Sequence, residues 1–162
     1  MNQPARHGKD RPNRIPWPPI LTLSALAVGI LLSVFWPLAW FGGAAGGVIQ
    51  AVGFALAATA VLLYATSFRE FRRANTTILP TGTASHLITT GPYRFTRNPI
   101  YLANVLLLLG IGAMFGLPWF FPIAILNGIG EQRLAVVREE AHLEHQFGKA
   151  WRDYRKRVRA WI

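Results

Sequence analysis

The placement of charged side chains constrains this chain more than any other feature. Residues 15–68 form a run of 54 residues without Asp, Glu, Lys, Arg or His, and residues 98–130 form a second such run of 33. A helix in water needs a polar face, whereas a helix that crosses a membrane needs roughly 20 consecutive apolar residues. The two runs therefore predict an all-α, integral membrane helical bundle in a single domain of 162 residues.

Turn signals divide each run into two apolar helices. Phe41, Gly42 and Gly43 interrupt the first run, and the tripeptide at 116–118 contains a glycine and a proline. The sequence thus predicts four transmembrane helices, at residues 19–40, 45–68, 99–115 and 117–137.

Lysine and arginine indicate the orientation of the bundle. All 17 fall in residues 1–14, 69–97 and 131–162, and the predicted turns between spans carry none. By the positive-inside rule, both termini and the central block are cytoplasmic at the cell (inner) membrane, facing anionic lipid. We expect three regions: a disordered basic N-terminus (1–14), a first transmembrane hairpin (15–68), and a functional core (69–162) with the second hairpin.

The segment 91–101 has the composition of an anion site. Asn98 is a favourable N-cap and Pro99 suits the first helical position, so a helix is expected to begin here. Its free N–H groups, with Arg94 and Arg97 just before them, would attract a carboxylate or a phosphate. The alternative is a capped helix with arginines that merely follow the positive-inside rule.

Two adjacent acids, Glu139 and Glu140, interrupt the basic C-terminal block. They are able to bind a cation or the amine and hydroxyl groups of a ligand. The alternative is ordinary helix pairing, for example of Glu140 with Arg133 or Arg138.

An apolar stripe follows the acids at helical spacing and predicts an interfacial amphipathic helix along the bilayer, with Gly148 as a possible break. Its members are Leu143, Phe147, Trp151, Tyr154, Val158 and Trp161. Interleaved aromatic and basic residues also occur in nucleic-acid binders, but the topology favours anionic lipid, so no nucleic-acid partner is expected. Glu139-x-x-His142 occurs once, whereas a di-iron bundle needs two such units, so no metal is expected.

Glu131 and Arg133 fall within the fourth predicted span, near its cytoplasmic end. An ionisable residue at that depth is costly and indicates function. The alternative is that the two residues pair with each other or extend to the interface.

Together the two stretches resemble the isoprenylcysteine carboxyl methyltransferase family, which is similar to membrane phospholipid N-methyltransferases. The resemblance covers residues 68–162. The motif is Gly91-x-Tyr93-x-x-x-Arg97-Asn98-Pro99-x-Tyr101, followed by Glu139-Glu140-x-x-Leu143-x-x-x-Phe147-Gly148-x-x-Trp151-x-x-Tyr154. The chain has Asn98 where the family usually has His, and Ala103 where it usually has Gly.

The resemblance implies a methyltransferase that uses S-adenosylmethionine and a lipophilic small-molecule or lipid acceptor, methylated at O, N or S. Arg97, Glu131 and Arg133 are then the candidates for orienting or deprotonating the acceptor. The cofactor would be held by Tyr93, Arg97, Asn98, Pro99, Tyr101, Glu139 and Glu140. Asn98 also leaves open an inactive or regulatory member of this fold.

Two other classes are compatible with a small membrane bundle. Some sterol reductases are similar in the C-terminal region, so a membrane reductase with a nicotinamide cofactor is an alternative. A transporter is disfavoured, because neither apolar run holds a charge at mid-membrane depth.

Overall fold

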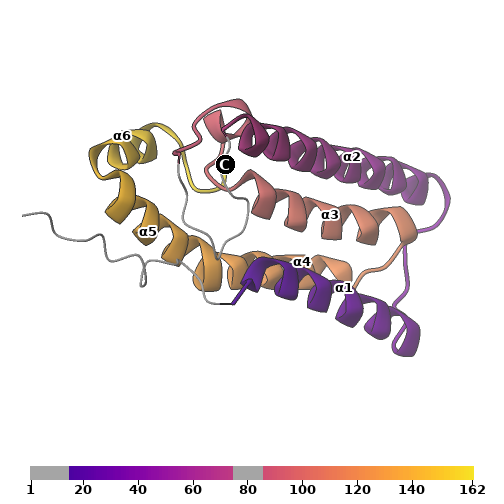
Figure 1. Ribbon diagram of the computed structural model, residues 1–162. Helices are drawn as coiled ribbons and strands as arrows, with labels where there is room; N and C mark the ends of the chain where they lie inside the picture. The colour runs from indigo at the N-terminus through magenta and orange to yellow at the C-terminus, as the bar shows by residue number, and fades with distance from the viewer. Residues whose placement is uncertain (1–14, 75–85) are drawn as a thin grey trace, which may run out of the picture.

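The computed structural model describes residues 15–74 and 86–162, and the described residues contain helices and no strand. Four helices lie alongside one another, and two short helices extend from one end of this bundle (Figure 1). The elements in chain order are α1 (Trp17–Phe35), α2 (Gly43–Arg73), the 3₁₀ helix η1 (Gly91–Arg94), α3 (Pro99–Phe115), α4 (Phe120–Glu131), the π-helix η2 (Gln132–Val136), α5 (Val137–Phe147) and α6 (Lys149–Arg157). The all-α prediction is confirmed, whereas the prediction for residues 1–14 lies outside the described residues.

The first two helices have the length and composition of membrane spans. In α1 and α2 the most apolar windows have a mean hydropathy of 2.0, and only 22% and 11% of those windows are buried within the protein. Large apolar side chains such as Leu31, Val34 and Leu62 point outward, where lipid would cover them. The third helix, α3, is also apolar but has 17 residues.

The ends of α1 and α2 differ from the ends of the predicted spans, whereas both ends of α3 agree with them. Helix α1 ends at Phe35 rather than near residue 40, because Trp36 precedes Pro37 and takes φ −134° and ψ 68°. Helix α2 runs on to Arg73, well into the charged block. The bounds predicted for α3 are confirmed, and Gly116 ends it with a φ of +64°.

The fourth predicted span is one continuous helical path of changing type. Helix α4 begins at Phe120, passes through the π-helical turn η2, and continues as α5 without a break. A π-helical turn rotates the residues beyond it relative to those before it. The predicted break at Gly148 is confirmed, because this residue has a φ of +51° and separates α5 from α6.

The close approach of α2 and α3 depends on glycine. A Cβ at Gly53 would lie 2.6 Å from the backbone nitrogen of Met114, and a Cβ at Gly110 would lie 2.9 Å from that of Ala57. Small residues that let backbones meet are the usual means of packing helices in lipid.

The two turns predicted between the spans meet at one end of the bundle. The Trp40 ring stacks on Phe121 at a centroid distance of 5.8 Å, and the Trp119 indole donates a hydrogen bond to the Trp36 carbonyl at 2.7 Å. The topology prediction requires this arrangement. Which side of the membrane the turns face stays a prediction.

Candidate functional site

An ion pair joins the two sequence stretches that stood out by composition. The Arg97 guanidinium donates to the Glu140 carboxylate through Nη2 at 2.6 Å and through Nε at 3.0 Å. Both side chains are largely buried, with 9% and 18% exposed. Charge-assisted bonds of this geometry are among the stronger ones in proteins. Glu140 therefore pairs with neither Arg133 nor Arg138, and the start of α3 is fixed to α5.

Residues 158–161, here called the strap, cross the start of α3. Arg97 donates to the Val158 carbonyl through Nη1 at 2.6 Å and to the Arg159 carbonyl through its backbone nitrogen at 2.9 Å. Thr96 Oγ1 and Asn98 Nδ2 both donate to the carbonyl of Ala160, at 3.0 and 2.8 Å. The protein itself thus supplies acceptors where an external anion was expected.

Asn98 holds the predicted N-cap position of α3 and Pro99 the first helical position, but the Asn98 side chain makes no capping bond. Its amide donates to the strap instead. This corrects the expectation that Asn98 caps the helix. The position requires a donor that reaches the Ala160 carbonyl, and the Asn amide provides one.

Beside the ion pair lies a second acid with a phenolic partner. The Tyr101 hydroxyl donates to Glu139 Oε1 at 2.6 Å. Burial raises the pKa of the Glu139 carboxyl above its usual value, and the bond from Tyr101 partly offsets this effect. Burial also raises the pKa of Tyr93, and the nearby carboxylate of Glu139 adds to the increase. Two of the expected cofactor tyrosines thus lie near Glu139.

The aromatic residues of α6 face the protein rather than the bilayer. Trp151 and Tyr154 are 2% and 3% exposed. The Arg97 guanidinium carbon lies 5.6 Å from the centre of the Trp151 ring, and the Tyr154 hydroxyl donates to the Tyr93 carbonyl at 2.7 Å. Trp151 and Tyr154, two members of the predicted interfacial stripe, therefore pack onto the segment that contains Tyr93 and Arg97.

Glu70 was missed by the sequence reasoning. It is 6% exposed, accepts a hydrogen bond from Thr90, and pairs with Arg73 at 3.3 Å. A Cβ at Gly91, whose φ is +60°, would lie 2.8 Å from Glu70 Cγ. Glu70 thus holds the turn that leads to Tyr93. It is the only acid between Asp10 and Glu131, and this isolation was the available signal.

Glu131 lies inside the bundle. It has no exposed surface, and it accepts hydrogen bonds from Asn104 and, at 3.3 Å, from Thr22. Tyr64 in turn donates to Asn104, so the layer links α1, α2, α3 and α4. Glu131 Oε2 has no hydrogen-bond partner among the described residues. Glu131 and Arg133, expected to share a role or to pair, point in different directions.

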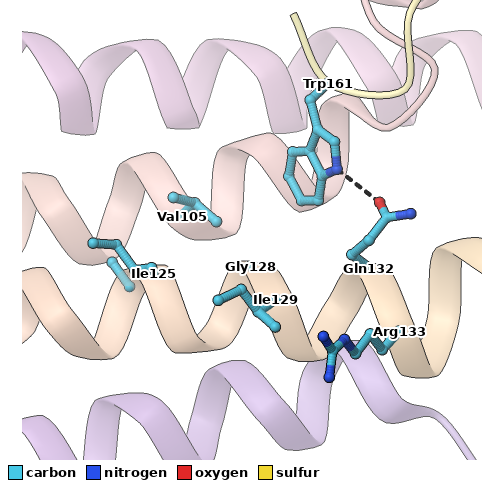
Figure 2. Close-up of a pocket in the computed structure, with 8 residues that line it drawn as sticks. Val105, Ile125, Gly128, Ile129, Gln132, Arg133 and Trp161 are labelled. Carbon is cyan, nitrogen blue, oxygen red and sulfur yellow. Dashed lines mark hydrogen bonds between the residues drawn. The ribbon is translucent and has the colours of Figure 1, made fainter.

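An open groove of about 470 Å³ runs between α3 and α4. Its walls are mostly apolar, and Arg133, Gln132 and Trp161 lie at the end nearest η2 (Figure 2). The lining residues are Val105, Ala124, Ile125, Gly128, Ile129, Gln132, Arg133 and Trp161. The groove thus combines an apolar channel with one cation. Glu131 does not line it.

Trp161 contacts both this groove and the Tyr101 region. Its indole lines the groove and also packs on the cluster of Tyr101, Ala135 and Val136. The indole Nε1 donates to Gln132 Oε1 at 2.7 Å, the bond drawn in Figure 2. Neither Gln132 nor Trp161 was predicted as a site residue, because their meeting depends on the path of the strap and on the π-helical turn.

These features define a helical membrane protein with a lateral apolar groove and a polar site beside it. A family model described as phospholipid methyltransferase matches residues 48–150, which is more than half of the chain. The chain therefore belongs to the phospholipid methyltransferase family, whose members are membrane methyltransferases that use S-adenosylmethionine. The family agrees with the methyltransferase class and the S-adenosylmethionine cofactor that the motifs imply. The apolar helices agree with the membrane protein predicted from the two uncharged runs.

One curated relative carries a different activity in its name. The chain is 31% identical over 85 residues to "Delta(14)-sterol reductase LBR" of Gallus gallus. The match covers 50% of this chain and 13% of that protein, so the chain spans a small part of its relative. No solved structure matches the chain significantly.

The polar site has groups suited to S-adenosylmethionine. The buried nitrogens without a hydrogen-bond partner in the described part of the chain include Nε2 of His142 on α5 and Nε1 of Trp151 on α6. The cofactor offers a carboxylate, hydroxyls and ring nitrogens as partners, and Glu139 suits its ammonium or ribose hydroxyls. Among the described residues no group of three or more His, Cys, Asp or Glu is placed to hold a metal.

Proposed function

We propose that this chain transfers a methyl group from S-adenosylmethionine to a lipophilic acceptor that enters sideways between α3 and α4, as in an isoprenylcysteine carboxyl methyltransferase-like enzyme. The observation that carries the proposal is the groove. Its walls suit an apolar chain, its end holds the cation of Arg133, and Trp161, which lines it, also packs on the Tyr101 cluster.

In this proposal the cofactor residues divide into two groups. Tyr93, Tyr101 and Glu139 contact the cofactor, since Tyr101 binds Glu139 and Tyr93 lies close enough to that acid for its charge to act on the phenol. Arg97, Glu140 and Asn98 act as positioning residues, because their side-chain donors and acceptors already bind one another or the strap. Pro99 fixes the start of α3.

The acceptor side has one cation in the groove. Arg133 is exposed and lines the groove, so it is placed to orient a carboxylate or another anionic group of the acceptor. Arg97 is committed to Glu140 and to the strap. Glu131 belongs to the buried layer, so it supports the arrangement of the four helices and does not meet an acceptor in the groove.

The bound cofactor supplies an electrophilic methyl group, and displacement at that carbon needs alignment and exclusion of water more than acid–base chemistry. The protein meets those needs with rigid elements. The ion pair between Arg97 and Glu140 fixes α3 to α5, and the strap and α6 both pack onto Arg97. Asn98 in place of the family's usual His is compatible with this, since its amide serves the strap.

Calorimetry of the detergent-purified protein with S-adenosylhomocysteine tests the proposal. We expect saturable binding with one site, and methyl transfer from labelled S-adenosylmethionine to N-acetyl-S-farnesylcysteine or to phosphatidylethanolamine. Binding without transfer to either acceptor would favour an inactive or regulatory member of the family. Absence of binding would exclude the methyltransferase proposal for this chain.

The similarity to a sterol reductase supports one other candidate, a membrane reductase with a nicotinamide cofactor. The same calorimetric experiment with NADPH separates the two. Binding of NADPH and not of S-adenosylhomocysteine would favour the reductase.

A further inference from the structure

The indole of Trp161 contacts both sites of the proposed reaction. It lines the groove and also packs against the cluster of Tyr101, Ala135 and Val136. With the acceptor in the groove and the cofactor beside Tyr101, this side chain stands where the two sites meet.

One hydrogen bond, together with the packing on the Tyr101 cluster, holds the indole in place. Nε1 of Trp161 donates to Gln132 Oε1 at 2.7 Å, across the end of the groove. Gln132 begins the π-helical turn η2 and Arg133 follows it, and both residues line the groove. The carbonyls of residues 158–160 accept hydrogen bonds from Arg97 and Asn98, and these bonds anchor the strap. The Trp161 indole makes its own hydrogen bond to Gln132.

We propose that Trp161 and Gln132 form a gate between the groove and the Tyr101 site, with Trp161 as a positioning residue that moves aside to admit the acceptor's reactive end. This inference rests on the proposed function. The acceptor is a lipophilic molecule whose apolar chain lies along Val105, Ile125 and Ile129, and whose reactive end lies at Gln132 and Arg133.

The chain has no cysteine, so a single introduced thiol reports access behind the gate. Ala135 has no exposed surface and belongs to the cluster that Trp161 covers. In full-length protein that carries Ala135→Cys, we expect slow modification by N-ethylmaleimide. Adding either Gln132→Ala or Trp161→Phe removes the hydrogen bond between the two side chains. Gln132→Ala keeps the indole, and Trp161→Phe keeps an aromatic ring at position 161. Each should accelerate the modification by roughly three- to tenfold, the effect of one neutral hydrogen bond.

Two controls separate a gate from general loosening. Trp119→Phe removes an indole hydrogen bond of the same 2.7 Å length at the opposite end of the bundle and should leave the Ala135→Cys rate unchanged. A thiol at Ala60, which is equally buried on α2, should react no faster in the gate variants.

The proposal is overturned if both gate variants leave the rate at Ala135→Cys unchanged, or if Trp119→Phe raises it as much. Acceleration at Ala60→Cys in the same variants overturns it too, since the whole bundle would then have loosened. Binding of S-adenosylhomocysteine, measured separately, tests the proposed function, so a failure of one is distinguishable from a failure of the other.

Discussion

Glu139 is a residue at which stability and ligand binding are expected to oppose each other. Because burial raises the pKa of its carboxyl, the ionised form destabilises the folded state above the pKa of the unfolded chain, and protonation removes that cost at lower pH. Glu139→Gln keeps an oxygen that accepts from Tyr101 and removes the charge. We expect the variant to unfold at a higher temperature than the parent at pH 8, with the difference vanishing toward about pH 4, the ordinary range for Glu.

The measurement is thermal unfolding in detergent at the two pH values. Weaker binding of S-adenosylhomocysteine by Glu139→Gln should accompany the gain in stability. A variant that is less stable than the parent at pH 8 would show that the ionised carboxylate stabilises the fold.

Arg97 and Glu140 are expected to influence the cofactor together. Glu140→Ala or Arg97→Ala removes the ion pair at 2.6 Å, and the site between α3 and α5 then loses its brace. We expect calorimetric affinity for S-adenosylhomocysteine to fall by roughly ten- to hundredfold, as for loss of a charge-assisted bond. Glu144→Ala is the matched control, since it breaks only exposed pairs with Arg152 and Arg155, at 3.9 and 3.7 Å.

Equal effects of Glu140→Ala and Glu144→Ala on the affinity would mean that these acids only stabilise α5. Tyr101→Ala should also weaken binding, because it removes the partner of Glu139.

The residue types of the site were readable from the sequence, but their partners were not. Composition and spacing singled out Arg97, Asn98 and the two acids, and the family resemblance added Tyr101. The structure brings these residues together. Local spacing predicted Asn98 as a cap, whereas a carbonyl 62 positions away takes its amide. Contacts of that sequence separation depend on the path of the strap, which has no periodic pattern to reveal it.

Among the elements, α2 and α3 form the pair most sensitive to side-chain volume. Gly53→Val would place a Cβ 2.6 Å from the Met114 backbone nitrogen, so the helices must separate. Overpacking of this kind costs about 1–3 kcal/mol. We expect a lower unfolding temperature in detergent for Gly53→Val.

Gly47→Val tests the same substitution on the same helix, where a Cβ meets nothing within 4 Å. If Gly47→Val lowers the unfolding temperature as much as Gly53→Val, the loss comes from the valine in the helix and not from the contact with α3.

The sequence correctly predicted the bounds of a helix where a nearby proline or glycine determines them. The bounds of α3 are set by Pro99 at one end and Gly116 at the other, and both signals are short-range. The start of α4, its π-helical turn and the inward face of α6 depend instead on packing against other elements. Hydrophobic periodicity correctly placed Trp151 and Tyr154 on one face, but it cannot tell lipid from protein as the partner of that face.

At the scale of the whole molecule, the orientation in the membrane stays a prediction. It is supported by the finding that the two turns between the spans lie together at one end of the bundle. Reporter fusions at Gly43 and at Gly116 should both report a non-cytoplasmic location, because the arginine-rich blocks lie toward the other end. A fusion at Ile162 should report a cytoplasmic one. A cytoplasmic signal at either glycine would contradict the four-span topology.

The strap has a consequence for biosynthesis. Arg97 receives its partners from residues 43 to 61 positions later in the chain, Glu140, Arg155 and Val158. During synthesis, α3 therefore enters the membrane before any of these groups exists, and its first turn waits with an unpaired guanidinium at the lipid surface. The spans can insert one after another, but the contacts that hold the candidate site together form only after residues 140–160 have been synthesised.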